Sequence, residues 1–414
     1  MIRLKSSRSK VLILAFTLVV VMLGYGMVIP IIPFYVEEMG AGGMELGLLV
    51  ACYALMRLIF GPMWGSLSDR VGRKPVLMVG VFGYAITMFF FGLATQLWML
   101  FVARIVSGLL SSATSPTTLA YISDSTTEED RGGGMGILGA AIGLGTILGP
   151  GLGGCLSGDS LARPFFLAAA LSLVAVALIY LLLPESLPPQ KRRSITLTLS
   201  DFSARRGSVT KERANELWAA LTGPIGVLLL LAFLVTCGVT TFYGIFGLYV
   251  LERFGYGPAE VGTMLMVMGL VSAVAQGALC GPLIRRRGEL WLIRASLGVG
   301  GGSFLLIMIA DGFSWLLVST GFFFMVTALL MPALTALISK RTTMEQGITM
   351  GLSNSAMSLG RIAGPLWGGF AFDLNIRYPF WGGAAILLAG FLVSLVRLNG
   401  ERVLQTDGTL ESAE

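Results

Sequence analysis

Twelve long apolar runs are the feature that most constrains how this sequence can fold. Each run has about twenty residues or more, the length of helix that crosses the hydrocarbon core of a bilayer. Hydrophobic residues make up 55% of the chain and charged residues only 13%, which excludes an ordinary soluble domain. The runs lie at residues 11–36, 45–65, 75–95, 97–121, 134–157, 163–183, 224–250, 260–284, 290–310, 315–339, 347–371 and 379–399. The sequence therefore predicts an all-α polytopic membrane protein with twelve transmembrane helices.

Positive charge between the runs predicts which ends of the helices face the cytoplasm. The termini and one alternating set of loops hold 22 of the 29 lysine and arginine residues, whereas the other set holds three, at Arg163, Arg253 and Arg377. Cytoplasmic loops of membrane proteins carry the excess of positive charge. We therefore expect both termini in the cytoplasm and a multi-pass protein in the plasma or inner membrane of a bacterium. Cations placed in this way do not indicate a nucleic-acid partner.

The chain is divided and repeated in a way that predicts two similar halves. A polar segment at 184–223 separates six runs from six. The segment Gly145–Gly154 recurs as Gly360–Gly369 at an offset of 215 residues, and Pro116 recurs as Pro332 at an offset of 216. We expect an N-terminal half at 1–183, a cytoplasmic linker at 184–223, a C-terminal half at 224–399 and a cytoplasmic tail at 400–414.

The polar loop between the second and third runs has glycines, cations and one acid at fixed places. It reads Gly65-Ser-Leu-Ser-Asp69-Arg70-Val-Gly72-Arg73-Lys74-Pro75. Gly65 and Gly72 allow a sharp turn and close helix approach, and Asp69 can pair with Arg73 or cap the next helix. An ordinary cytoplasmic loop would explain the cations alone. The stretch resembles the signature G-x-L-x-D-R-x-G-R-K of the major facilitator superfamily and matches every fixed position.

Further motifs resemble one branch of that superfamily, the twelve-span drug:proton antiporters, which includes multidrug and tetracycline-type exporters. The fifth run contains three glycines on one helix face and a helix-bending proline, and it resembles the G-x-x-x-G-P-x-x-G-G antiporter signature. Its residues are Gly145, Gly149, Pro150, Gly153 and Gly154. The alternative is a generic packing face, and the second copy at Gly360–Gly369 is interpreted as structural. Leu100-x-x-x-Arg104-x-x-Ser107-Gly108 and the Met27–Pro33 segment are similar to two other signatures, and the resemblance links Arg104 to proton transfer.

The resemblance also implies a charge relay at the cytoplasmic side. Asp124 ends the fourth run, where the family often has an acid facing the signature loop. We expect a relay of Asp69, Arg73 and Asp124, with Arg70 beside it, that latches this side. Local capping contacts are the alternative for Asp124.

The positions of charged residues within the apolar runs indicate which side chains face the interior of the bundle. All 23 acids lie at run ends or in loops, whereas Arg57, Arg104 and Arg361 lie deep within runs. A charge at mid-bilayer costs at least about 2.5–3.5 kcal/mol on insertion scales, so these side chains face the bundle interior or water. The resemblance places the second and eleventh runs at a shared central cavity. The residues expected to line it are Arg57, Arg361, Tyr25, Tyr53, Asn354, Ser358, Phe242 and Tyr243. Pairing with backbone carbonyls is the alternative for the arginines.

The resemblance implies a secondary active exporter of a small organic compound, working by proton antiport and alternating access. Candidate proton carriers are Asp69, Asp124, Glu37 and Glu38. Two cavity arginines favour an anionic, zwitterionic or acceptor-rich substrate. The expected partners are the substrate, protons and lipid, with a functional monomer, no cofactor and no metal.

Two other functions were weighed. A facilitator or importer is the nearest alternative, and the antiporter-type glycines oppose it. A polytopic membrane enzyme is the other, but the sequence has no histidine, no buried carboxylate pair and no cysteine cluster, so we expect no enzyme.

Overall fold

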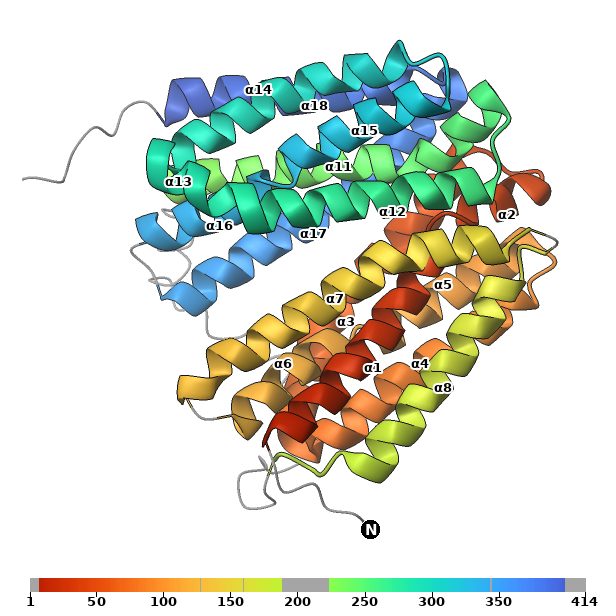
Figure 1. The fold of residues 1–414 in the computed structure, drawn as a ribbon, viewed down its shortest axis with the longest axis vertical. Helices are drawn as coiled ribbons and strands as arrows, with labels where there is room; N and C mark the ends of the chain where they lie inside the picture. The colour runs from red at the N-terminus through yellow and green to blue at the C-terminus, as the bar shows by residue number, and fades with distance from the viewer. Residues whose placement is uncertain (1–6, 127, 159, 188–222, 343–344, 399–414) are drawn as a thin grey trace, which may run out of the picture.

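The computed structural model describes residues 7–126, 128–158, 160–187, 223–342 and 345–398, and within these ranges regular structure is helical throughout (Figure 1). The all-α expectation is confirmed. The N-terminal half contains α1 (Ser7–Val28), α2 (Ile32–Glu38), α3 (Gly43–Val71), α4 (Arg73–Gly92), α5 (Leu97–Ser111), α6 (Thr114–Ser125), α7 (Glu128–Leu156) and α8 (Arg163–Leu182). The C-terminal half contains α11 (Pro224–Phe254), α12 (Pro258–Val274), the π-helix η2 (Ala275–Cys280), α13 (Gly281–Arg287), α14 (Glu289–Met308), α15 (Phe313–Thr327), α16 (Leu330–Arg341), α17 (Gln346–Leu374) and α18 (Tyr378–Arg397).

Four predicted spans are interrupted instead of continuous. The first changes from α1 to α2 around Pro30, and the eighth passes through the π-helix η2. The fourth and tenth break at equivalent places, so that Pro116 and Pro332 each fall in the first turn of the new helix, α6 or α16. Proline is tolerated there because the first turn has no intrahelical acceptor for its missing N–H. The pseudo-symmetry therefore extends to the breaks.

The turn at the signature loop is shorter than the sequence suggested. Helix α3 runs on to Val71 and α4 begins at Arg73, so Gly72 alone forms the turn, with φ 122°. Gly65 lies inside α3 and has no turning role, which corrects the expectation for it. Polar residues outside the apolar layer can continue a helix, and only the left-handed region at Gly72 stops this one. Gly288 does the same between α13 and α14, with φ 81°.

Eleven helical segments within the described residues are long and apolar enough to cross a membrane. The eleventh expected span, 347–371, forms α17, a 29-residue helix that is not among those eleven segments. Helix α17 carries Asn354, Ser358 and Arg361, so the expected apolarity of this span was wrong although its helix and position were right. A polar stripe lowers mean hydropathy but is tolerated where it faces the protein interior or water.

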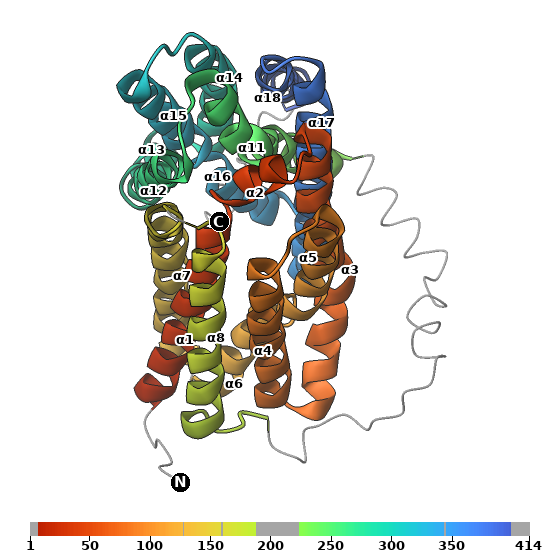
Figure 2. The ribbon, with the colours of Figure 1, turned by 90° about the vertical axis from the view of Figure 1, so that its right-hand side faces the viewer.

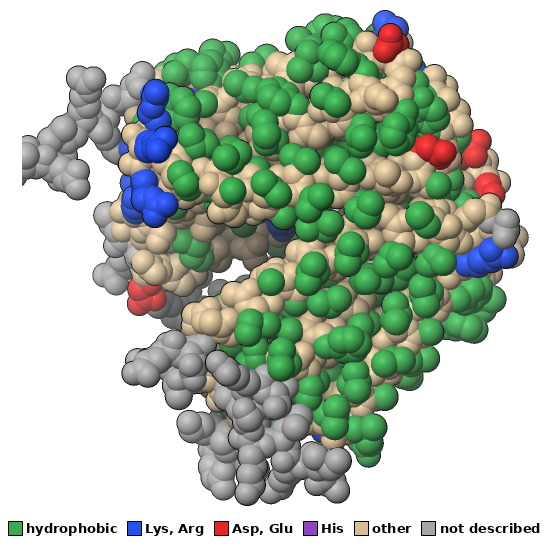
Figure 3. Space-filling view, viewed as in Figure 1, with side chains coloured by type: hydrophobic (Ala, Val, Ile, Leu, Met, Phe, Trp, Pro, Cys, Tyr) green, Lys and Arg blue, Asp and Glu red, His purple; other side chains and the backbone are tan. Residues whose placement is uncertain are grey.

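The two halves lie against each other at one end and separate toward the other (Figures 1 and 2). Helix α3 packs on α17, and α7 packs on α12. In the space-filling view a hollow opens between the halves on the left, near the arginines at the end of α13, while acidic side chains gather on the right (Figure 3). We call the end with Arg73 and Arg285–Arg287 the basic end, and the end with Glu37, Glu252 and Asp373 the acidic end.

The start of the expected linker belongs to the N-terminal half. The Tyr121 hydroxyl donates a 2.5 Å hydrogen bond to the Pro184 carbonyl, and Leu187 is buried. The rest of the linker, 188–222, and the tail at 400–414 lie outside the described residues, so their expected cytoplasmic positions stay predictions.

Candidate transport site and gates

The glycines of α7 place this helix directly against α1. A Cβ atom built on Gly145 would lie 2.6 Å from Met22 Cβ, one on Gly149 would lie 2.7 Å from Gly26 Cα, and one on Gly153 would lie 2.3 Å from the Met27 carbonyl oxygen. Because these distances are shorter than 3 Å, none of the three positions can hold a side chain unless the backbone moves. The sequence-predicted glycine face therefore lies in a close helix crossing.

The same helix uses a second face to contact the other half. A Cβ on Gly154 would lie 2.4 Å from the Pro258 carbonyl oxygen, and a Cβ on Gly262 would lie 2.4 Å from the Pro150 carbonyl oxygen. Helix α7 thus lies between α1 and α12, and glycine and proline positions form the closest approaches to both.

The C-terminal copy of the motif makes the equivalent contacts. Gly360, Gly364 and Gly368 pack on α11, as their counterparts pack on α1. A Cβ on Gly47 would lie 2.3 Å from the Pro365 carbonyl oxygen, and one on Gly369 would lie 2.1 Å from the Gly43 carbonyl oxygen. Two crossings related by the internal repeat therefore join the halves, and the second copy is as closely packed as the first.

At the acidic end a carboxylate from one half caps a helix of the other. The Gly43 N–H donates to Asp373 Oδ1 at 2.7 Å, and the Met44 N–H donates to Asp373 Oδ2 at 2.9 Å. Both donors are amides of the first turn of α3, which have no acceptor within the helix and lie at its positive N-terminus. A Cβ on Gly43 would lie 2.9 Å from the same oxygen, so glycine is needed for this approach. Asp373 is not among the residues expected from the sequence, because only the fold brings it to α3.

Toward the basic end the same helices lose these close contacts. Gly61 of α3, Gly139 of α7 and Gly347 and Gly351 of α17 have no atom within 4 Å of a built Cβ. The hollow visible in Figure 3 lies on this side. The structure is therefore closed at the acidic end and open at the basic end.

The polar stripe of α17 faces the space between the halves. Asn354, Ser358 and Arg361 share one face with Pro365, because residues three or four apart lie above one another on a helix. Pro365 lies against α3 of the opposite half, which directs the rest of this face toward the N-terminal half below the crossing. Arg361 is exposed, and within the described residues it has no hydrogen bond or ion pair.

The N-terminal half supplies two further arginines around one tyrosine. Arg57 lies 5.7 Å from the centre of the Tyr53 ring and donates a long, 3.5 Å hydrogen bond to Ser115. Arg104 lies 4.7 Å from the same ring, is only 4% exposed, and its Nε has no partner. Tyr25 stacks on Tyr53 at 5.8 Å between ring centres. The three arginines have no carboxylate beside them in the part of the chain that the structure describes.

The two remaining aromatic residues of the expected cavity differ. Tyr243 is 38% exposed, whereas Phe242 is 1% exposed and stacks on Phe246 at 4.6 Å inside the aromatic core of the C-terminal half. Phe242 therefore does not line the hollow in this conformation. The sequence alone does not show whether an aromatic residue in a span packs in the core or lines a cavity.

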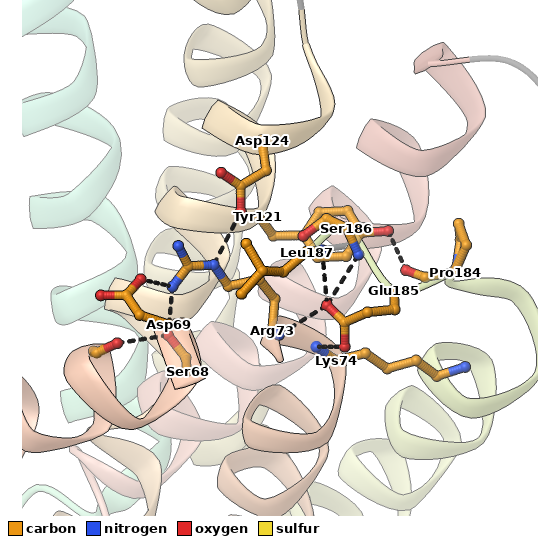
Figure 4. A network of polar contacts seen from close by, with 11 residues as sticks. Ser68, Asp69, Arg73, Lys74, Tyr121, Asp124, Pro184, Glu185, Ser186 and Leu187 are labelled. Carbon is orange, nitrogen blue, oxygen red and sulfur yellow. Dashed lines mark hydrogen bonds and ion pairs between the residues drawn. The ribbon is translucent and has the colours of Figure 1, made fainter. Parts of the chain in front are cut away.

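The relay residues meet as expected (Figure 4). Arg73 Nη1 lies 2.5 Å from Asp69 Oδ1 and donates to Ser68 Oγ at 2.7 Å, and Arg73 Nε lies 3.0 Å from Asp124 Oδ2. The contacts join α3, α4 and α6 within the N-terminal half. Arg70 is partly buried and lies in the last turn of α3.

Glu185 completes this network and was missed by the sequence analysis. Its carboxylate accepts hydrogen bonds from the Arg73 N–H at 2.9 Å and the Lys74 N–H at 3.2 Å, and thereby caps α4. The same group accepts from Ser186 and Leu187, which orders the residues after α8. An acid directly after the proline that ends the sixth run was the signal available.

A twelve-helix membrane bundle of two repeated halves, with a polar hollow between them, defines the class of polytopic membrane transporters. The chain belongs to the Major Facilitator Superfamily, whose family model matches residues 14–324 and 228–411. It is 32% identical to Multidrug resistance protein 2 of Bacillus subtilis strain 168, over 93% of this chain and 94% of the relative. It is 28% identical to Quinolone resistance protein NorA of Staphylococcus aureus strain MRSA252, over 94% of this chain and 96% of the relative.

Solved structures have the same fold at low identity. A bacterial homologue of the human lysosomal transporter Spinster, in an inward-facing and unoccupied conformation, aligns with a TM-score of 0.77 and 15% identity over 95% of this chain and 98% of that one. The human organic anion transporter MFSD10 aligns with a TM-score of 0.67 and 21% identity over 94% of this chain and all of that one.

Proposed function

We propose that this transporter exports drug-like organic compounds from the cytoplasm in exchange for protons. The observation that carries the proposal is its near full-length similarity to a multidrug resistance protein and a quinolone resistance protein. The antiporter-type glycines in a close crossing with both α1 and α12 agree with it.

The conformation, open at the basic end and closed at the acidic end, is one step of an alternating-access cycle. The positive-inside rule makes the basic end cytoplasmic, so both termini are assigned to the cytoplasm and the open hollow is loaded from inside. Two glycine crossings act as pivots, and the halves rock about them to open the acidic end. Asp373 holds that end closed, while the Asp69–Arg73–Asp124 network shapes the cytoplasmic gate. The protein acts as a monomer and is not an enzyme.

Proton coupling is assigned to carboxylates at the helix ends. Two candidates are Asp69 and Asp124, whose side chains are partly exposed beside Arg73. The other two are Glu37 and Glu38, which are neighbouring exposed residues at the acidic end. Arg104 is proposed to transmit the protonation state to the hollow through Tyr53.

Transport by purified protein in proteoliposomes tests this function. With an imposed pH gradient, norfloxacin should move against its own gradient, and an ionophore that removes the pH gradient should stop net movement. Movement of substrate only down its gradient, unaffected by the ionophore, would instead indicate a facilitator.

A further inference from the structure

The hollow contains positive charge that nothing in the described protein balances. Arg57 lies in α3 and Arg361 lies in α17, two helices from opposite halves that pack against each other. Within the described residues Arg361 is exposed without a hydrogen bond or ion pair, whereas Arg57 lies over the Tyr53 ring and donates a long, 3.5 Å hydrogen bond to Ser115. Every described carboxylate belongs to a helix end or a loop. Bringing two guanidinium groups together in an interior is unfavourable unless an anion or strong acceptor joins them.

Arg104 adds a second, independent observation. Its side chain is buried and its Nε atom has no hydrogen-bond partner. Only the faces of Tyr53 and Phe91 lie against its charge, at 4.7 and 6.0 Å. Cation–π contacts offset part of the desolvation of a guanidinium but leave its N–H donors unused. A negative charge in the hollow would stabilise this buried cation as well as the two beside it.

The aromatic residues indicate what the rest of the ligand is like. Tyr25 and Tyr53 are stacked with ring planes 27° apart, and Tyr243 exposes its ring from the other half. A flat aromatic body can extend this stack while its acidic group reaches the arginines.

We propose that the hollow binds an aromatic carboxylate, with the carboxylate held between Arg57 and Arg361 and the ring system against Tyr25. This substrate class rests on the proposed export function and sharpens it. Arginine suits the role because its planar group donates two parallel hydrogen bonds to one carboxylate. A lipophilic cation without an acceptor would meet repulsion in the same place.

The test compares norfloxacin with its methyl ester, because the two differ only at the carboxylate. Binding is measured on purified protein in nanodiscs of zwitterionic lipid, which removes competing anionic headgroups. We expect norfloxacin to bind the parent protein at least tenfold more tightly than the ester. Equal affinity, or tighter binding of the ester, would overturn the proposal.

Variants then assign the effect to the arginines. Arg57→Gln and Arg361→Gln should each weaken norfloxacin binding about tenfold or more, as expected for a lost charge-assisted hydrogen bond, and leave ester binding within about twofold. Arg361→Lys should retain part of the affinity because it keeps the charge. Ester binding shows that each variant is folded.

The matched control is Arg294→Gln. Arg294 lies in α14 and donates to the Ser394 carbonyl at 3.0 Å, and α14 packs on helices of its own half. It should change neither affinity. Loss of norfloxacin binding in this control to the same extent as in Arg361→Gln would contradict a specific site. Carboxylate-dependent binding without proton-driven transport would leave the site intact and refute the proposed antiport instead.

Discussion

Arg73 connects four groups near the signature loop, and single substitutions there distinguish an effect on gating from an effect on folding. Its side chain contacts Asp69, Asp124 and Ser68, while its backbone N–H binds Glu185. We expect Asp69→Asn and Arg73→Ala to slow transport without preventing folding, because the network lies at the ends of α3, α4 and α6. Arg73→Ala should lower the free energy of unfolding by about 1–3 kcal/mol, since it removes hydrogen bonds between charged groups. Transport rate and thermal unfolding of the purified variants check this; normal turnover in both would exclude a gating role.

Glu185 allows a sharper prediction at the same scale. Glu185→Gln keeps the shape of the side chain but removes the negative charge at the N-terminus of α4, which is worth about 0.3–1 kcal/mol. We expect a small loss of thermal stability and slower transport. Glu252→Gln is the control, because Glu252 is an exposed acid in the last turn of α11, where a negative charge does not stabilise a helix N-terminus, and it should not lower the stability. Equal effects of the two substitutions would refute a specific role for Glu185.

Helices α7 and α17 show how one spacing of glycines builds two equivalent joints. Gly149→Leu should cripple transport, because a built Cβ already lies 2.7 Å from the α1 backbone. Pro150→Leu should do the same by removing the bend. We expect Gly364→Leu to reduce transport as much as Gly149→Leu does, since a Cβ at this position would lie 2.5 Å from the Cys237 carbonyl oxygen. Gly139→Leu, on α7 where nothing lies within 4 Å, should transport normally. Drug efflux by cells expressing equal amounts of each variant measures this; efflux by Gly364→Leu at the control rate would restrict the pivot to one copy.

The helices and the sequence motifs were predictable from local pattern, whereas contacts across the fold were not. Hydropathy located every span within a few residues, and the offset of 215 predicted that the glycine motif occurs in both halves. Pattern could not show that Phe242 is buried and Tyr243 exposed, because neighbouring aromatic residues in a span have the same composition signal. Nor could it pair Asp373 with α3, which lies 330 residues away along the chain. The polar stripe of α17 was visible as single residues, but its direction depends on where Pro365 packs.

For the molecule as a whole, Asp373 predicts how the balance between its two conformations can be shifted. Asp373→Ala removes two charge-assisted hydrogen bonds between the halves, and we expect it to favour opening of the acidic end by about 1–3 kcal/mol. Spin labels on Glu38 and Asp311, both exposed and in different halves, should report longer distances in the variant. The labels require a background in which Cys52, Cys155, Cys237 and Cys280 are replaced. An unchanged distance distribution would show that the glycine crossings alone keep this end closed.

Topology is tested on the whole molecule as well. A cysteine introduced near residue 200, in the same background, should resist labelling from outside intact cells, because the cation distribution places that segment in the cytoplasm. Ready labelling would reverse the orientation of every helix.

Three arginines without a neighbouring acid in the described bundle also have an electrical consequence. If an anion leaves through the hollow, a negative charge crosses the membrane, and a cell interior that is negative by 100 mV favours this by about 2.3 kcal/mol per charge. Exchange for an entering proton moves a second charge in the same favourable sense. In vesicles without a pH gradient, a potassium diffusion potential that is negative on the basic-end side should accelerate movement of nalidixate toward the other side, and the opposite potential should slow it. A rate indifferent to the potential would mean that the carried complex is neutral. Such an exporter would keep working in an alkaline medium, where the pH gradient is small and voltage is the main energy source left to the cell.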